Sequence, residues 1–254
     1  MPQADENPVW NGWDVLWITA LTLIAMLVSQ FAVVVAAQWF VYPRASLADV
    51  AQKPIVLLAS QLPVYIVVAA FMIALVEGKY RTPFWRAVRW NWPRRPWALL
   101  ALALGAVMFV VLSLLQFVLP MPKNTPFEQL FDRPRDAYLI SLLAVTVGPL
   151  MEELFFRGFL YPVLARWIGA VWGVLLSALP FGLIHYLQYR SWAVVFIITI
   201  VGVVCGAVRA TTKSVGASFL VHVGYNGVEM FLLMLATHGF RHMGNAAAFN
   251  RFWQ

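Results

Sequence analysis

The stretch VGPLMEELFFRGFL, residues 147–160, places two glutamates and an arginine inside a run that is otherwise almost wholly apolar. The run begins near Tyr138 and continues beyond Arg157 through GFLYPVLA, so the charges do not mark its end. About 20 apolar residues suffice for a helix to cross a bilayer. Glu152 lies about 14 residues, or roughly 21 Å of helix rise, after Tyr138, which places it within the hydrocarbon layer. Charges at that depth are costly and usually functional.

The composition extends this interpretation to the whole chain. Of its 254 residues, 62% are hydrophobic and 11% are charged, whereas soluble domains carry about 25% charged residues. The sequence therefore predicts an all-α, polytopic transmembrane helical bundle of about seven spans, with eight as the alternative. The apolar runs are continuous rather than alternating, which excludes a transmembrane β-barrel. The expected spans are 15–41, 54–76, 97–119, 138–167, 171–187, 192–209 and 215–237.

The net charge of +7 does not indicate a nucleic-acid partner, because the basic residues lie in loops beside the membrane. The most basic loop, residues 79–95, holds six Lys and Arg among several tryptophans, which is typical of a cytoplasmic interface. Seven spans then place the N-terminus in the cytoplasm and the C-terminus outside. The single cysteine, Cys205, excludes an intrachain disulfide.

No long polar linker separates the spans, so we expect one integral-membrane domain over residues 1–254, with a motif-bearing core at 138–237. The stretches GAVWG (169–173) and GVVCG (202–206) have the GxxxG spacing of closely packed helices. Packing within the monomer is the first interpretation and dimerisation the second, so the oligomeric state stays open. Since no cleavable signal peptide or organelle signal is evident, we expect a bacterial inner (plasma) membrane protein.

The three charges differ in what they can do. Glu153 and Arg157 are four residues apart, so they can pair on one face of a helix. Glu152 lies about 100° around the helix from Glu153, and that pairing leaves it free. A free carboxylate in a partly dehydrated site is suited to act as a general base.

Further polar residues follow on two later spans. His185 ends the stretch FGLIH, five residues after Pro180, where we expect the helix to be short, tilted or broken. In HVGYNGVE, the spacing places His222, Asn226 and Glu229 on one helix face. A lone intramembrane histidine is as often a packing residue as a functional one. Two histidines, an asparagine and a free carboxylate on three spans favour a functional site.

Three motifs carry a resemblance to a known family. EELFFR (152–157) matches EExxxR, FGLIH (181–185) matches FxxxH, and HVGYN (222–226) matches HxxxN. In this order on successive late helices, they resemble the CAAX protease and bacteriocin-processing (CPBP, or Abi) family of intramembrane proteases. That family includes the type II CAAX prenyl endopeptidase.

The resemblance implies a role for each motif residue. Glu152 and His185 would activate a water molecule, while His222 and Asn226 would stabilise the oxyanion of the tetrahedral intermediate. Glu153, Arg157 and Phe181 would support the geometry. Glu229 lies outside the family pattern, and we interpret it as a supporting partner or a polar cavity wall.

The residues leave a metal undecided. Glu152, His185 and His222 could hold Zn²⁺ with water in the open position. No HExxH occurs, however, and a glutamate with a histidine works without an ion. We therefore expect either no required cofactor or a zinc ion.

The leading hypothesis is an intramembrane endopeptidase in the lipid bilayer that cleaves a peptide or a prenylated protein. One alternative is a catalytically silent scaffold or bacteriocin-immunity protein with the same fold. The other is a proton-coupled transporter, although the inverted repeats of such carriers are not evident. Other intramembrane protease classes fit less well, because the chain has neither a GxSG nucleophile motif nor an intramembrane aspartate pair.

Overall fold

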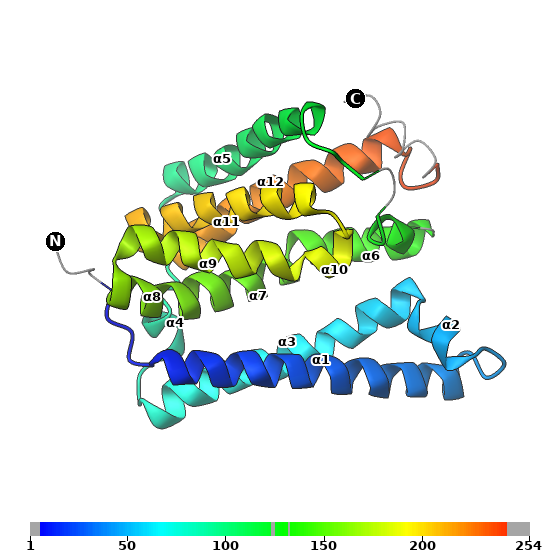
Figure 1. Cartoon of the computed structure of the whole chain (residues 1–254), viewed down its shortest axis with the longest axis horizontal. Helices are drawn as coiled ribbons and strands as arrows, with labels where there is room; N and C mark the ends of the chain where they lie inside the picture. The colour runs from blue at the N-terminus through cyan, green and yellow to red at the C-terminus, as the bar shows by residue number, and fades with distance from the viewer. Residues whose placement is uncertain (1–5, 123–124, 132, 243–254) are drawn as a thin grey trace. The chain divides into compact units, whose positions relative to one another are not determined.

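A computed structural model describes residues 6–122, 125–131 and 133–242, and the regular structure of these residues is entirely helical (Figure 1). Within them, seven helical stretches are long and apolar enough to cross a membrane, which confirms the predicted polytopic all-α bundle. No predicted boundary differs from the structure by more than four residues. The chain is an integral membrane protein. Its spans are Gly12–Phe40, Pro54–Lys79, Arg95–Phe117, Pro134–Ile168, Ala170–Tyr189, Trp192–Thr212 and Val215–Ala236.

The described chain divides into two compact units, residues 9–84 and residues 6–8 together with 85–242. The smaller unit is a helical hairpin in which α1 packs against α3. In the membrane, the hydroxyl of Ser29 donates to the carbonyl of Ser60 at 2.6 Å, which satisfies both groups. The elements of this unit are α1 (Gly12–Phe40), α2 (Leu47–Ala51), α3 (Pro54–Ile73) and the π-helix η1 (Ala74–Lys79).

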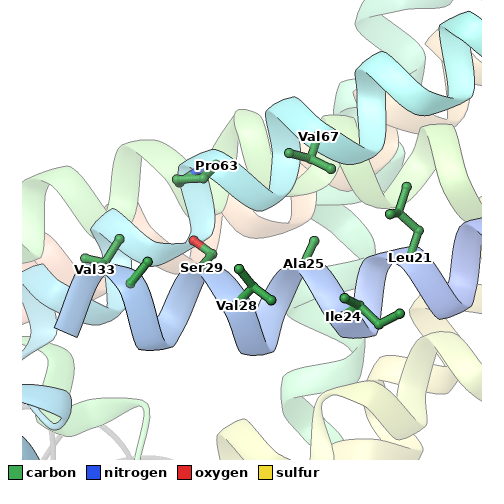
Figure 2. A pocket seen from close by; sticks show the side chains of 9 residues that line it. Leu21, Ile24, Ala25, Val28, Ser29, Val33, Pro63 and Val67 are labelled. Carbon is green, nitrogen blue, oxygen red and sulfur yellow. The ribbon is translucent and has the colours of Figure 1, made fainter. Parts of the chain in front are cut away.

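A groove of about 370 Å³ runs between α1 and α3 (Figure 2). Its lining is apolar apart from Ser29, and Pro63 of α3 faces it. None of the motif residues lines the groove.

The larger unit holds the three motifs. Its α12 packs along α5, and its α9 packs between α8 and α11 (Figure 1). The elements are α4 (Phe84–Ala87), α5 (Arg95–Ser113), the 3₁₀-helices η2 (Leu114–Phe117) and η3 (Glu128–Phe131), α6 (Pro134–Val145), α7 (Val147–Glu153), the π-helix η4 (Leu154–Leu160), α8 (Tyr161–Ile168), α9 (Ala170–Ile184), α10 (Tyr186–Tyr189), α11 (Trp192–Thr212) and α12 (Val215–Ala236).

Of the four GxxxG glycines, three lie at contacts between helices and one lies at a turn. Gly173, Gly202 and Gly206 lie where neighbouring helices approach, and a Cβ on Gly173 would come within 2.9 Å of the backbone nitrogen of Ala165. This agrees with packing inside the monomer. Gly169 instead has a φ of 86°, which ends α8 and lets the chain reverse into α9.

The span that carries the glutamates is assembled from four helical pieces. Pro149 has no N–H for the carbonyl of Val145, and its ring crowds that carbonyl, so the helix breaks at Thr146. The helix after Glu153 then widens into the π-turn η4, whose last bond joins the Tyr161 N–H to the Phe156 carbonyl. Turns of this kind are rare in proteins, and those that occur are frequently found at functional sites.

Candidate active site

Glu152 lies near the end of α7, roughly midway along its 35-residue span. Its Oε1 is 4.0 Å from Nε2 of His185, and its Oε2 is 3.7 Å from Nε2 of His222. The side chain of Glu152 keeps an exposed fraction of 25%. An accessible carboxylate therefore lies between two imidazoles that come from two other spans.

His185 reaches this position because α9 is short. The helix continues through Pro180 and ends at Ile184 after 15 residues, so the interruption falls at His185 itself. Its Nδ1 lies 2.8 Å from the carbonyl oxygen of Phe181. Because a carbonyl only accepts, this contact requires the hydrogen on Nδ1 and leaves the Nε2 lone pair of the neutral ring facing Glu152.

Glu153 is fully buried beside Arg157, which is also fully buried. Nη1 of Arg157 donates to Oε1 of Glu153 at 2.9 Å, and its Nη2 donates to the carbonyl of Gly202 at 2.8 Å. The guanidinium carbon lies 4.3 Å from the centre of the Phe181 ring. The ion pair thus brings two opposite charges together inside the protein, and its contacts join η4 to α9 and α11.

Glu153 also binds two residues of α12. Nδ1 of His222 lies 3.0 Å from its Oε1, and the hydroxyl of Ser218 donates to its Oε2 at 2.5 Å. Ser218 is fully buried, and the exposed fraction of His222 is only 3%. Glu153 is therefore the carboxylate that orients His222, in addition to being the partner of Arg157.

Phe181, the first residue of the FxxxH motif, packs against both the ion pair and the histidines. Its ring centre lies 5.3 Å from that of His185 and 5.7 Å from that of His222, both in edge-to-face geometry. It covers the guanidinium of Arg157 on another side. One buried ring thereby fixes the relative positions of three polar side chains.

Asn226 lies one turn beyond His222 on α12, and its Nδ2 donates to the carbonyl of Ala144 at 2.8 Å. That carbonyl lies in the last turn of α6, two residues before the break at Thr146, so Asn226 connects α12 to the broken span. An amide nitrogen carries two hydrogens, and the second one is available to another acceptor. Glu229 is partly buried one further turn along α12, and among the described residues its carboxylate makes no hydrogen bond or ion pair.

The metal alternative gains no geometric support. Glu152, His185 and His222 are residue types that bind Zn²⁺. In the described part of the chain, however, no three His, Cys, Asp or Glu side chains are arranged as a metal site.

Comparison with known families agrees with these motifs. Residues 134–228 match the family model described as type II CAAX prenyl endopeptidase Rce1-like. This part of the chain is similar to that family. The match confirms the resemblance inferred from the sequence and indicates, at the level of the family, an intramembrane protease. Neither the curated proteins nor the solved structures gave a match.

The Rce1-like segment contains all seven motif residues and ends one residue before Glu229. Its geometry also involves groups that the motifs do not reveal, namely Ser218, the carbonyl of Gly202 and the carbonyl of Ala144. Ser218 had a signal in the sequence, because it lies four residues before His222 on the same helix face. The two carbonyls had none, since any residue supplies one.

Proposed function

We propose that this protein is a glutamate-dependent intramembrane endopeptidase of the CAAX-protease type in a bacterial inner membrane. The observation that carries the proposal is the placement of Glu152 between Nε2 of His185 and Nε2 of His222. This arrangement lies at mid-span within the Rce1-like segment. A partly exposed carboxylate with two imidazoles beside it is suited to activate water.

The two separations exceed a direct hydrogen bond and suit one bridging water molecule. Glu152 takes a proton from this water while the oxygen attacks the carbonyl carbon of the scissile peptide bond, and His185 orients the water. The tetrahedral oxyanion is stabilised by donors from His222 and from the second amide hydrogen of Asn226. The C–N bond then breaks, and the proton held by Glu152 passes to the leaving nitrogen.

The substrate is a membrane-associated peptide, because the site lies within the spans. A C-terminal peptide with a prenylated cysteine and an unmodified membrane peptide are the two substrate classes to compare. The purified chain in proteoliposomes would be given a fluorogenic peptide of each kind, and release of the cleaved fragment would be followed.

The test compares the wild-type chain with Glu152→Gln, which keeps the size of the side chain and removes its basicity. We expect cleavage of at least one peptide by the wild type and a loss of about 10²–10⁴-fold in rate in the variant. Glu77→Gln, an exposed glutamate in η1, is the matched control and should retain the full rate. Retained cleavage in Glu152→Gln would refute the assignment, and a wild type without activity on any membrane peptide would favour the silent scaffold.

A further inference from the structure

A fully buried network lies behind His222, on the side away from Glu152. Glu153 is its centre, with Arg157 and His222 sharing Oε1 and Ser218 on Oε2. Glu153, Arg157 and Ser218 all have an exposed fraction of 0%. The carboxylate therefore receives three donors and has no surface exposed to solvent.

Ser218 occupies this place through its position on α12. It lies four residues before His222, so both side chains leave the helix on the face toward Glu153. Its hydroxyl oxygen is also 2.9 Å from the carbonyl of Cys205 on α11. The one hydroxyl hydrogen favours the carboxylate, because hydrogen bonds to an ionised acceptor are the stronger and shorter ones.

The network determines which nitrogen of His222 carries hydrogen. Arg157 is always charged, and its pairing keeps Glu153 ionised. An ionised carboxylate only accepts, so Nδ1 of His222 must donate to it. Nε2 of the neutral ring is then an acceptor that faces Oε2 of Glu152 at 3.7 Å.

We propose that Ser218 is a positioning residue, which fixes Glu153 so that its Oε1 holds the hydrogen on Nδ1 of His222 and directs Nε2 at Glu152. Without Ser218, the rotation of the carboxylate about its last torsion is restrained by Arg157 and His222 alone, both on one oxygen. The consequence for the reaction rests on the proposed function. Because Nε2 of the neutral ring has no hydrogen, His222 donates to an oxyanion only as an imidazolium. Glu153 on the Nδ1 side and the oxyanion itself on the Nε2 side then balance that charge.

The first test uses nuclear magnetic resonance of the full chain in lipid nanodiscs with ¹⁵N-labelled histidine, assigned with a His222→Gln variant. We expect a strongly downfield Nδ1–H proton on His222 in the wild type. Ser218→Ala should shift or broaden this signal, and Ser218→Thr, which keeps the hydroxyl, should retain it. A His222 without hydrogen on Nδ1, or a signal unchanged in Ser218→Ala, would overturn the proposal.

The second test measures kcat and KM separately on whichever membrane peptide the wild type cleaves. We expect Ser218→Ala to lower kcat by about 10–100-fold with KM unchanged, as the loss of an orienting hydrogen bond does, and Ser218→Thr to restore most of it. Ser177→Ala is the matched control, because among the described residues that buried hydroxyl bonds only to the Val174 carbonyl of its own helix. An unchanged kcat in Ser218→Ala contradicts the proposal. The resonance experiment decides the role of Ser218 even for a chain that cleaves nothing, so the two proposals fail separately.

Discussion

At the scale of single residues, two adjacent glutamates have opposite environments. Glu152 retains an exposed fraction of 25% and lies 3.7 Å or more from any imidazole nitrogen. Glu153 is fully buried and directly bonded to an arginine, a histidine and a serine. The first carboxylate is available to a substrate or to water, whereas the second belongs to the core.

This difference predicts that Arg157→Ala lowers the yield of folded protein, while Glu152→Gln leaves it nearly unchanged. Removal of the arginine leaves the carboxylate of Glu153 uncompensated in a low-dielectric site, at a cost of about 3–5 kcal/mol. The amount of monodisperse protein recovered from membranes, measured by size-exclusion chromatography, checks this. An equal loss of yield in both variants would contradict the division of roles.

The buried thiol and serines should have no covalent role. Cys205 is fully buried, and its neighbours are the Ser218 carbonyl and apolar side chains. Cys205→Ala, serine-directed reagents and thiol-directed reagents should therefore leave cleavage unchanged, whereas His185→Ala should remove most of it, about 10²–10⁴-fold. His238→Ala, an exposed histidine, serves as the control for His185→Ala. Mass spectrometry that trapped an acyl group on any serine or cysteine would disprove the mechanism.

At the scale of elements, the breaks in the helices position the site. Pro149 interrupts the motif-bearing span, η4 widens it directly after Glu153, and α9 ends at the residue before His185. Asn226 joins α12 to the last turn of α6, just before the first of these breaks, through the carbonyl of Ala144.

The close contact between α9 and α11 predicts that Gly202→Ala destabilises the larger unit. A Cβ at residue 202 would lie 2.9 Å from Cδ1 of Phe181 and 3.1 Å from Cβ of Ala178. Phe181 must then move from the guanidinium of Arg157, at a cost of about 1–3 kcal/mol for overpacking. Thermal unfolding in detergent should show a lower Tm for Gly202→Ala. Gly78→Ala is the control, because in the described part of the chain no atom outside its own stretch of helix lies within 4 Å of the added Cβ. An unchanged Tm in Gly202→Ala would contradict the packing argument.

The sequence alone predicts contacts within one helix better than contacts between helices. Span bounds and the Glu153–Arg157 pair depend on residues close together in the chain, so hydropathy and helical spacing predict them. The bonds of Ser218 to Glu153, of Arg157 to the Gly202 carbonyl and of Asn226 to the Ala144 carbonyl join residues 45 to 82 positions apart. Helical periodicity shows which face a residue occupies, but it does not show which helix that face meets. The family resemblance depends on the order of the three motifs, and it does not predict these contacts.

At the scale of the whole molecule, charge gathers at one end of the larger unit, where α11 ends and α12 begins. The carboxylate of Glu6 is bound by Arg209 through both guanidinium nitrogens, at 2.8 and 3.1 Å. Arg89 and Lys213 approach the same carboxylate at 3.3 and 3.6 Å. Three cations around one carboxylate leave this end positive, and the N-terminal segment is tied to residues more than 200 positions away.

This distribution of charge predicts the orientation of the chain in the membrane. The loop that follows the span Pro54–Lys79 contributes the greater part of the six Lys and Arg of residues 79–95, whereas the loop before that span has only Arg44 and Lys53. Lys and Arg in short loops are retained on the cytoplasmic side, so residues 80–94 should be cytoplasmic and residues 41–53 should lie outside. The weaker bias elsewhere along the chain makes this span the best place to test.

In a Cys205→Ala background, single cysteines at two exposed positions, Arg44→Cys and Arg86→Cys, would be exposed to a membrane-impermeant maleimide on intact bacterial cells. We expect labelling of Arg44→Cys in intact cells and labelling of Arg86→Cys only after the inner membrane is permeabilised. The Cys205→Ala chain without added cysteine gives the background. The opposite pattern would reverse the orientation, and it would require the loop tryptophans and arginines to face the outer leaflet despite their positive charge.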